Sequence, residues 1–190
     1  MLISKFDTTN VEENIKEFEG KYNFTFPDQY KYFLLEYNGG LTPKTNFKIN
    51  KVSSDIEGLY GFCLENKSYN YNKFEKIISF ENWLNDYVLP IGENSFGDYI
   101  MIGVGQENKG KVYFYYHDRP KKYIELTDDF ITFVSKCKSK KIGHIKSVQE
   151  RKEMLIKNGK EKNITDGWIK IWQVEIDKYA NIHQEELILP

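Results

Sequence analysis

The chain has 190 residues, of which 40% are hydrophobic, 16% aromatic and 29% charged, and 27 Lys and Arg against 28 Asp and Glu give a formal net charge of −1. This composition is typical of a folded globular domain, alone or with one appendage, and excludes collagen-like, disulfide-framework and disordered classes. The longest uncharged apolar stretch, Tyr99–Gln106, is far shorter than the roughly 18 residues of a membrane-spanning helix. The first residues lack the pattern of a secretory signal, so we expect a cytoplasmic location.

Charge is distributed unevenly along the chain. Residues from 136 onward carry 12 Lys and Arg against 8 Asp and Glu, which leaves 15 against 20 before that point. Neither part has the dense basic stripe that is typical of a nucleic-acid binder. The two cysteines, Cys63 and Cys137, lie 74 positions apart without metal-ligand neighbours, so we expect two reduced thiols.

Two helices are predicted near the N-terminus. An apolar stripe indicates a helix over residues 11–18. The signals for its ends are a capping-box pattern at Thr9 and Glu12 and a stop at Gly20. A second helix begins at Pro27 and carries its apolar stripe to Tyr37, where Asn38-Gly39-Gly40 ends it, because Asn and Gly tolerate the left-handed conformation of a C-terminal cap.

Strand patterns occupy the middle of the chain. A short strand is predicted around Phe47 and Ile49, then a loop over Ile56–Leu64 that leads into a further strand, and Tyr71–Trp83 is ambiguous. The remaining strand-like runs are Val88–Ile91, Tyr99–Val104, Lys111–Tyr116 and Tyr123–Leu126. The glycine-bounded turn at residues 105–110 indicates a hairpin, so an antiparallel meander is expected.

Helical patterns return after the strands. A helix from Thr127 to Cys137 should lie on the sheet, and a linker over residues 138–146 precedes a second capping box at Ser147 and Glu150. A final helix starts at Thr165. Its apolar residues are Trp168, Ile169, Ile171, Trp172, Ile176 and Tyr179. We therefore expect a domain over residues 1–140 and a helical extension over 141–190, packed on the body or on a second copy.

Five segments of the chain occur together in a recognisable order. They are Phe26–Tyr30 leading to Asn38-Gly39-Gly40, then Leu89-Pro90-Ile91-Gly92, Gly97-Asp98 before a strand, Gly110–Tyr115, and the helix from Thr127 to Val134. Over roughly residues 9–138 this combination resembles the SUKH superfamily, the Smi/Knr-like domain. The signature positions are Pro27, Asn38, Gly39, Gly40, Pro90, Gly97, Asp98 and Gly110. Where the family often has Trp-Asp-His, this chain has Tyr-Tyr-His-Asp over residues 115–118.

The resemblance implies an α+β fold with a mixed, mainly antiparallel sheet flanked by helices, and no enzymatic activity. Bacterial members are similar to immunity proteins that bind and neutralise a cognate toxin, often a nuclease, whereas fungal relatives are intracellular scaffolds. We therefore expect a toxin-binding immunity protein that uses no cofactor, metal, nucleic acid or membrane, with a homodimer through the C-terminal helix as an additional hypothesis. A Smi/Knr-type scaffold is the alternative.

Two patterns in the sequence resemble the catalytic residues of enzymes. His117-Asp118 is the only plausible acid–base pair, and a partner contact is the preferred interpretation. Asp98 with Glu107 and Lys109 imitates a metal-dependent nuclease, but the latter two lie at the end of the expected hairpin, where side chains point into water. The residues expected to bind a partner are Asp55, Glu57, Glu93, Asp98, Tyr113, Tyr115 and Asp118, chosen as acids in loops or at strand ends and as tyrosines of one strand.

Overall fold

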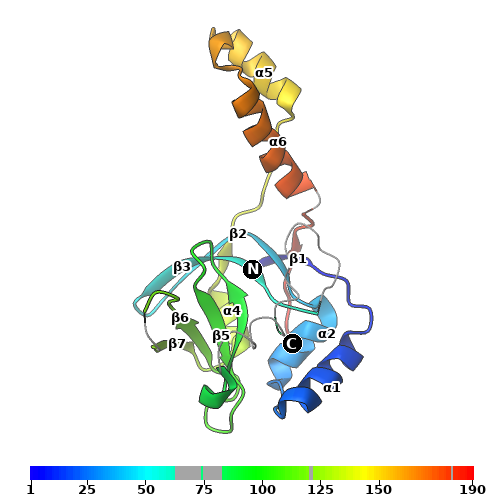
Figure 1. Ribbon diagram of the computed structural model, residues 1–190, viewed down its shortest axis with the longest axis vertical. Helices are drawn as coiled ribbons and strands as arrows, with labels where there is room; N and C mark the ends of the chain where they lie inside the picture. Colours follow the sequence, from blue (N-terminus) through cyan, green and yellow to red (C-terminus); the bar gives the residue numbers. More distant parts are fainter. Residues whose placement is uncertain (63–73, 75–82, 120–121, 181) are drawn as a thin grey trace. The chain divides into compact units, whose positions relative to one another are not determined.

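The computed structural model describes residues 1–62, 74, 83–119, 122–180 and 182–190, and the chain forms two compact units (Figure 1). The sheet unit contains Met1–Lys141 together with Gln184–Pro190, and the helical unit contains Ile142–His183. The sequence-based division placed all of residues 141–190 in one extension. In the structure the last seven residues group with the sheet unit instead.

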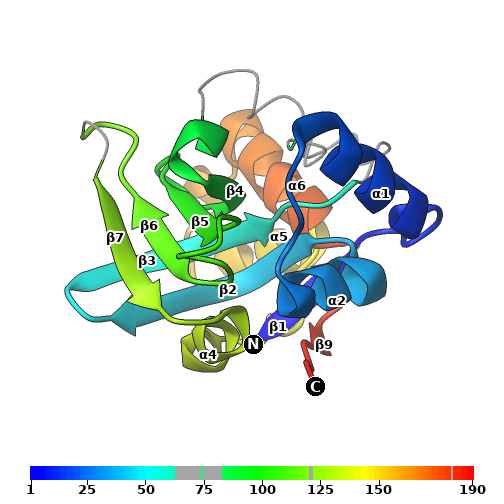
Figure 2. The same ribbon diagram turned by 90° about the horizontal axis from the view of Figure 1, so that it is seen from below.

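The sheet unit is built on a nine-stranded antiparallel sheet. Among the described residues its strand order is β7-β6-β5-β4-β3-β2-β1-β9 (Figure 2). The short β8 pairs with β2. The strands are β1 (Leu2–Lys5), β2 (Gly40–Ile49), β3 (Val52–Leu59), β4 (Val88–Glu93), β5 (Tyr99–Gly103), β6 (Val112–Tyr115), β7 (Tyr123–Thr127), β8 (Lys138–Ser139) and β9 (Glu185–Glu186). Strands β4 to β6 are consecutive neighbours, which confirms the predicted meander. With the helices, this sheet confirms the predicted α+β class.

Helix α1 (Val11–Tyr22) differs from its prediction at both ends. The predicted capping box is wrong, because Asn10 occupies the N-cap position at φ 61° and the Thr9 hydroxyl donates to an Asp7 carboxylate oxygen at 2.7 Å. The helix also continues through Gly20 and ends at Asn23, whose backbone is left-handed at φ 53°. Gly20 does not stop the helix, because a glycine is tolerated inside it and Asn23 provides the left-handed cap three residues later.

Helix α2 (Asp28–Tyr37) follows its prediction closely. Pro27 stands at its N-cap position, and Tyr30, Phe33 and Leu34 are fully buried. Asn38 adopts φ 50° and its N–H donates to the Leu34 carbonyl at 2.8 Å, which ends the helix.

Helix α4 (Phe130–Lys136) packs on the sheet unit as expected. An Asp129 carboxylate oxygen accepts from the Thr132 N–H at 2.7 Å and caps the helix. The Phe130 ring lies 5.1 Å from the Tyr30 ring of α2, and Phe133 lies 5.5 Å from Phe47 of β2. The helices and the sheet therefore share one aromatic core.

Strand β3 corrects a second expectation. The predicted loop over Ile56–Leu64 is wrong for Ile56–Leu59, because Val52–Leu59 is a strand that pairs with β2. Its Val52 and Ile56 are buried, whereas Ser53 is exposed. The sequence of a strand with polar residues on one face resembles that of a loop. Only the pairing with β2 across the hairpin identifies this segment as a strand. The ambiguous Tyr71–Trp83 segment lies outside the described residues, apart from buried Phe74 and Trp83.

The C-terminal residues close the sheet unit at its far edge. Strand β9 pairs with β1 through Leu2–Glu186 and Ile3–Glu185, and Leu187 is buried in the core. The Tyr37 hydroxyl accepts from the Ile188 N–H at 3.0 Å and lies 3.2 Å from the Ile188 carbonyl. Residues beyond the helical unit thus complete the sheet unit.

The helical unit contains α5 (Val148–Lys157), a short 3-10 turn η2 (Glu161–Asn163) and α6 (Asp166–Ala180). The predicted capping box is confirmed, because the Ser147 hydroxyl accepts from the Glu150 N–H and a Glu150 carboxylate oxygen accepts from the Ser147 N–H. Arg151 joins the helices by donating to Glu175 at 2.7 Å. Helices α5 and α6 contain no buried residue.

Candidate functional site

The turn between β4 and β5, residues Asn94–Asp98, gathers several of the predicted partner-binding acids. Glu93 leads into the turn at the end of β4. Asp55 of β3 accepts from the Ser95 N–H at 3.2 Å. Asp118 presents a carboxylate oxygen within 4.8 Å of ligand atoms of Asp98 and His117. We call this region the turn patch, and its members are Asp55, Glu93, Phe96, Asp98, His117 and Asp118.

Hydrogen bonds of Asn94 build the turn. Its side-chain oxygen accepts from the N–H groups of Phe96 at 2.9 Å and Asp98 at 2.8 Å, while its own N–H donates to the Asp98 carbonyl at 3.0 Å. Gly97 adopts φ 85°, which a residue with a side chain would rarely take. The turn therefore has a fixed shape, with Phe96 75% exposed on it.

Phe96 is a candidate contact residue that the sequence analysis missed. An aromatic side chain that is three-quarters exposed at a rigid turn is typical of an interface anchor. The signal available in the sequence was the Asn-x-x-Gly-Asp pattern, because an Asn-led turn that closes on Gly97 leaves the intervening residues outside the sheet.

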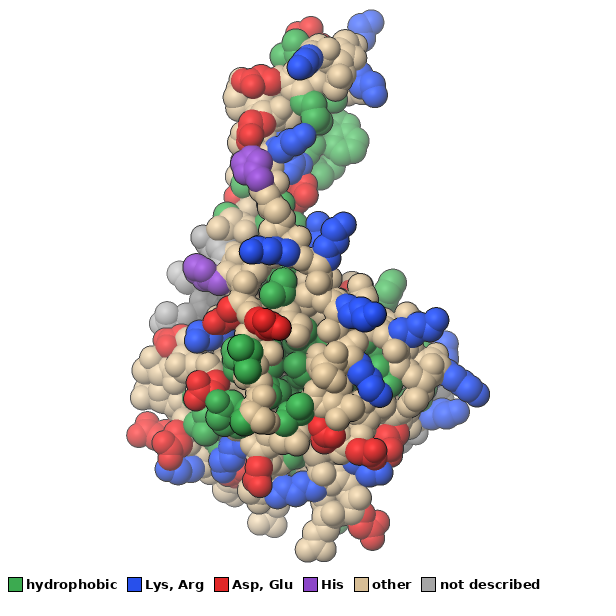
Figure 3. All heavy atoms as spheres, turned by 180° about the vertical axis from the view of Figure 1, so that it is seen from behind, with side chains coloured by type: hydrophobic (Ala, Val, Ile, Leu, Met, Phe, Trp, Pro, Cys, Tyr) green, Lys and Arg blue, Asp and Glu red, His purple; other side chains and the backbone are tan. Residues whose placement is uncertain are grey.

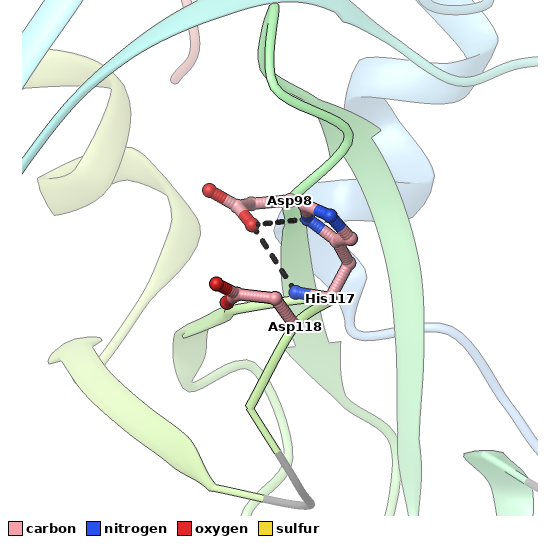
Figure 4. Close-up of side chains that lie close together, drawn as sticks. All are labelled: Asp98, His117 and Asp118. Atoms are coloured by element: carbon pink, nitrogen blue, oxygen red, sulfur yellow. Dashed lines mark hydrogen bonds and ion pairs between the residues drawn. The ribbon is translucent and has the colours of Figure 1, made fainter.

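Buried Asp98 and half-exposed His117 form a hydrogen-bonded pair in the turn patch (Figure 4). One Asp98 carboxylate oxygen lies 2.8 Å from the His117 Nδ1 and also accepts from the His117 backbone N–H at 3.1 Å. The other oxygen accepts from the Asn94 amide at 3.0 Å. Asp98 is 6% exposed, whereas the His117 side chain is 52% exposed. The pair therefore ties the β4–β5 turn to the segment after β6.

The charge state of Asp98 follows from this environment. Burial alone would raise the pKa of Asp98, but the hydrogen bonds from His117 and Asn94 outweigh it and hold the pKa below its usual value. Asp98 is therefore ionised at neutral pH. With exposed Asp118 beside it, the cluster carries two carboxylates around one imidazole.

The remaining predicted contact residues lie elsewhere on the sheet unit. Glu57 is half-buried on β3, and Tyr113 is half-buried on β6. Tyr115 is only 5% exposed, because its ring lies 5.0 Å from Trp83 and 5.6 Å from Tyr123. Tyr115 thus supports its neighbours and offers little surface, as buried Asp98 also does.

The Asn-Gly-Gly signature after α2 has a structural explanation. The buried Asn38 side chain accepts from the Phe62 N–H at 2.7 Å and donates to the Asp7 carbonyl. Gly39 adopts φ 80°, and a Cβ atom there would lie 2.6 Å from the Leu59 carbonyl oxygen. The chain can pass this point only without a side chain. The signature therefore fixes the route from α2 into β2.

The other signature positions mark the ends and bends of strands. They are Pro27 at the start of α2, Pro90 within β4 beside a register shift, Gly97 in the turn patch, and Gly110 at φ 87° before β6.

Of the two enzyme patterns, only His117-Asp118 meets Asp98 among the described residues. Glu107 and Lys109 lie in the turn between β5 and β6, as expected, where the Asn108 side chain bonds to Gly105 and Tyr87. Burial raises the pKa of the Cys137 thiol to about 12, which makes it a poor nucleophile. The face of the sheet unit seen in Figure 3 carries both acidic and basic side chains.

Comparison with protein families decides the identity of the sheet unit. The model of the SMI1 / KNR4 family (SUKH-1) matches residues 11–136. The chain belongs to this family. The match confirms the resemblance drawn from the signature residues, and the SUKH-1 region runs from the start of α1 to the end of α4. A search of curated proteins finds no match.

The helical unit lies outside the SUKH-1 match. Its helices border an open groove of about 510 Å³. The apolar lining residues include Ile145, Met154, Leu155, Trp168 and Trp172. Arg151 lies 6.0 Å from the Trp172 ring and is held there by its bond to Glu175. Within the part of the chain that the structure describes, no helix is long and apolar enough to cross a membrane.

Proposed function

We propose that this SUKH-1 protein is a non-catalytic immunity protein that binds and neutralises a cognate bacterial toxin in the cytoplasm, and that the toxin is a nuclease. The observation that carries the proposal is the family match, which covers residues 11–136 of the sheet unit. The turn patch supplies a rigid surface that fits a protein partner. An intracellular scaffold of the Smi/Knr type is the alternative.

The charge of the sheet unit supports a basic partner. Of the 27 Lys and Arg and 28 Asp and Glu in the chain, the helical unit has 8 and 6, which leaves 19 and 22 in the sheet unit. A nuclease must attract the phosphates of its substrate, so its cleft is basic. The turn patch could therefore use Asp55, Glu93 and Asp118 to oppose such a cleft, while Phe96 supplies the apolar anchor.

The first experiment tests immunity itself. A toxin encoded immediately upstream is expressed with and without this protein, and cell survival and co-purification are scored. We expect survival and a stable complex only when both are present. Cell death despite expression of the folded protein would contradict the immunity role and favour the scaffold.

The second experiment tests the turn patch within that complex. Phe96→Ala should raise the dissociation rate, because a central aromatic anchor commonly contributes more than about 2 kcal/mol to binding. The matched control is Tyr87→Ala, a 62% exposed aromatic residue just before the opposite end of β4. Asp55→Asn with Asp118→Asn should slow association, and the difference should shrink as salt rises. Equal rates for all variants would place the interface elsewhere.

A third measurement separates binding from catalysis. Purified protein with Mg²⁺, Mn²⁺ or Zn²⁺ should leave DNA and RNA intact, because Glu107 and Lys109 lie in a turn. Cleavage that disappears in Asp98→Ala and Glu107→Ala variants would establish the nuclease alternative.

A further inference from the structure

Three metal-ligating side chains, one buried and two exposed, meet in the turn patch (Figure 4). Asp98, His117 and Asp118 each offer one ligand atom, and these atoms lie within 4.8 Å of one another. No other group of three His, Cys, Asp or Glu side chains meets this spacing in the described residues. We propose that Asp98, His117 and Asp118 bind a divalent transition-metal ion such as Ni²⁺ or Mn²⁺.

Asp98 and His117 are close enough to share one ion. The Asp98 carboxylate oxygen and the His117 Nδ1 are 2.8 Å apart and share a hydrogen bond. With metal–ligand bonds of about 2.1 Å, two neighbouring ligands of one octahedral ion lie about 3.0 Å apart. An ion could therefore replace the shared proton after a small movement of the two side chains.

Neighbouring groups hold the ligands in place. The amide of Asn94 and the backbone N–H of His117 fix the Asp98 carboxylate, so it is oriented before an ion arrives. Asp118 directly follows His117, which restricts where its carboxylate can lie. The imidazole is 52% exposed and has room to turn its Nδ1 lone pair toward an ion, with its proton moved to Nε2.

Charge also favours a cation at this cluster. Two carboxylates stand beside an imidazole, and the exposed Arg119 side chain is a competing cation, with its Nε 3.9 Å from Asp118. An exposed pair of this kind contributes little, so a divalent ion can displace it. Imidazole combined with carboxylates suits Mn²⁺ and Ni²⁺ better than Mg²⁺, which prefers oxygen ligands and keeps its waters.

A bound ion would change the surface proposed for partner binding. It would offset the two carboxylate charges of the cluster and join the β4–β5 turn to the segment after β6. The metal site is nevertheless independent of the proposed function, because it is tested with this protein alone.

The experiment is a calorimetric titration of untagged, metal-free protein with NiCl₂, with MgCl₂ as the comparison ion. We expect one Ni²⁺ ion to bind per chain, and we expect no heat of binding when MgCl₂ is added. His117→Gln and Asp118→Asn should each weaken Ni²⁺ binding at least tenfold. The matched control is His144→Gln, which removes the other histidine that faces a carboxylate, Glu150 at 2.9 Å, and should leave the affinity unchanged.

A second readout does not depend on variants. Substoichiometric Mn²⁺ should broaden the NMR signals of the His117 ring and the Asn94–Asp98 amides before those of His144 and His183. Absence of Ni²⁺ binding, binding lost only in His144→Gln, or binding unaffected by both His117→Gln and Asp118→Asn would overturn the proposal. Mn²⁺ broadening centred on His144 or His183 would overturn it as well.

Discussion

Asn38 allows the sharpest test of how the SUKH-1 signature maintains the fold. Its buried side chain satisfies the Phe62 N–H and the Asp7 carbonyl, and its backbone is left-handed at φ 50°. Asn38→Ala removes both hydrogen bonds, and each half-buried group left unsatisfied costs about 1–2 kcal/mol. Alanine also adopts the left-handed conformation at a cost of about 1 kcal/mol. We expect a loss of about 3–5 kcal/mol in the free energy of unfolding.

Two further variants separate the contributions. Asn38→Gly loses the same hydrogen bonds but tolerates the backbone conformation, so it should cost about 1 kcal/mol less than Asn38→Ala. Asn10→Gly is the matched control, because Asn10 is also left-handed at φ 61° but makes no side-chain capping bond to its helix. It should change stability by less than about 0.5 kcal/mol.

Equilibrium urea unfolding, followed by far-ultraviolet circular dichroism, measures all three variants. The slope with urea should stay constant, so that the midpoints report stability alone. An Asn38→Gly protein within about 0.5 kcal/mol of the original would refute the reasoning. Asn38 would then serve the backbone conformation alone, and its hydrogen bonds would contribute little.

Three further predictions concern single side chains. Leu187→Ala should lower the free energy of unfolding, measured by urea denaturation, by about 2–5 kcal/mol, because Leu187 is buried. Ile188→Ala should change it little, because the Ile188 side chain is 68% exposed. Hydrogen bonds from the Ser147 N–H, His144 and the Ser147 hydroxyl lower the pKa of Glu150 to about 2. The stability that the α5 cap gains from ionised Glu150 should therefore be complete above pH about 4.5 and lost as pH falls toward 2. A Glu150 carboxyl NMR signal that titrates near 4.5 would disprove this. Burial raises the pKa of Cys137 to about 12, so peptide mass spectrometry should show alkylation by iodoacetamide at pH 8 only after unfolding.

Local signals in the sequence predicted elements whose limits are themselves local. Helix α2 is one such case, because Pro27 presets its first turn and Asn38 ends it. The capping box at Ser147 is another, since both of its partners lie within four residues. The same pattern at Thr9 failed because Asp7, two residues earlier, takes the Thr9 hydroxyl and Asn10 takes the cap position. Local patterns decide structure only when no nearby group competes for the same hydrogen bond.

Long-range pairing accounts for what the sequence did not predict. Strand β9 pairs with β1 from the opposite end of the chain, and two glutamates give no strand signal of their own. The contact between Asp98 and His117 spans 19 positions and depends on the pairing of β5 with β6. The sequence shows His117-Asp118 as a pair, but only the pairing of the strands brings Asp98 next to it.

The turn patch combines two kinds of residue with different freedom to change. Asn94, Gly97 and Asp98 hold the backbone of the turn, so replacing them would disturb hydrogen bonds or a left-handed conformation. Phe96 and Asp118 are exposed, and replacing either one would leave the backbone of the turn in place. A fold built this way can alter the chemistry of its contact surface at little cost in stability. That separation suits a protein that must match one particular partner, and it is the reason that Phe96→Ala should alter binding while the unfolding midpoint remains the same.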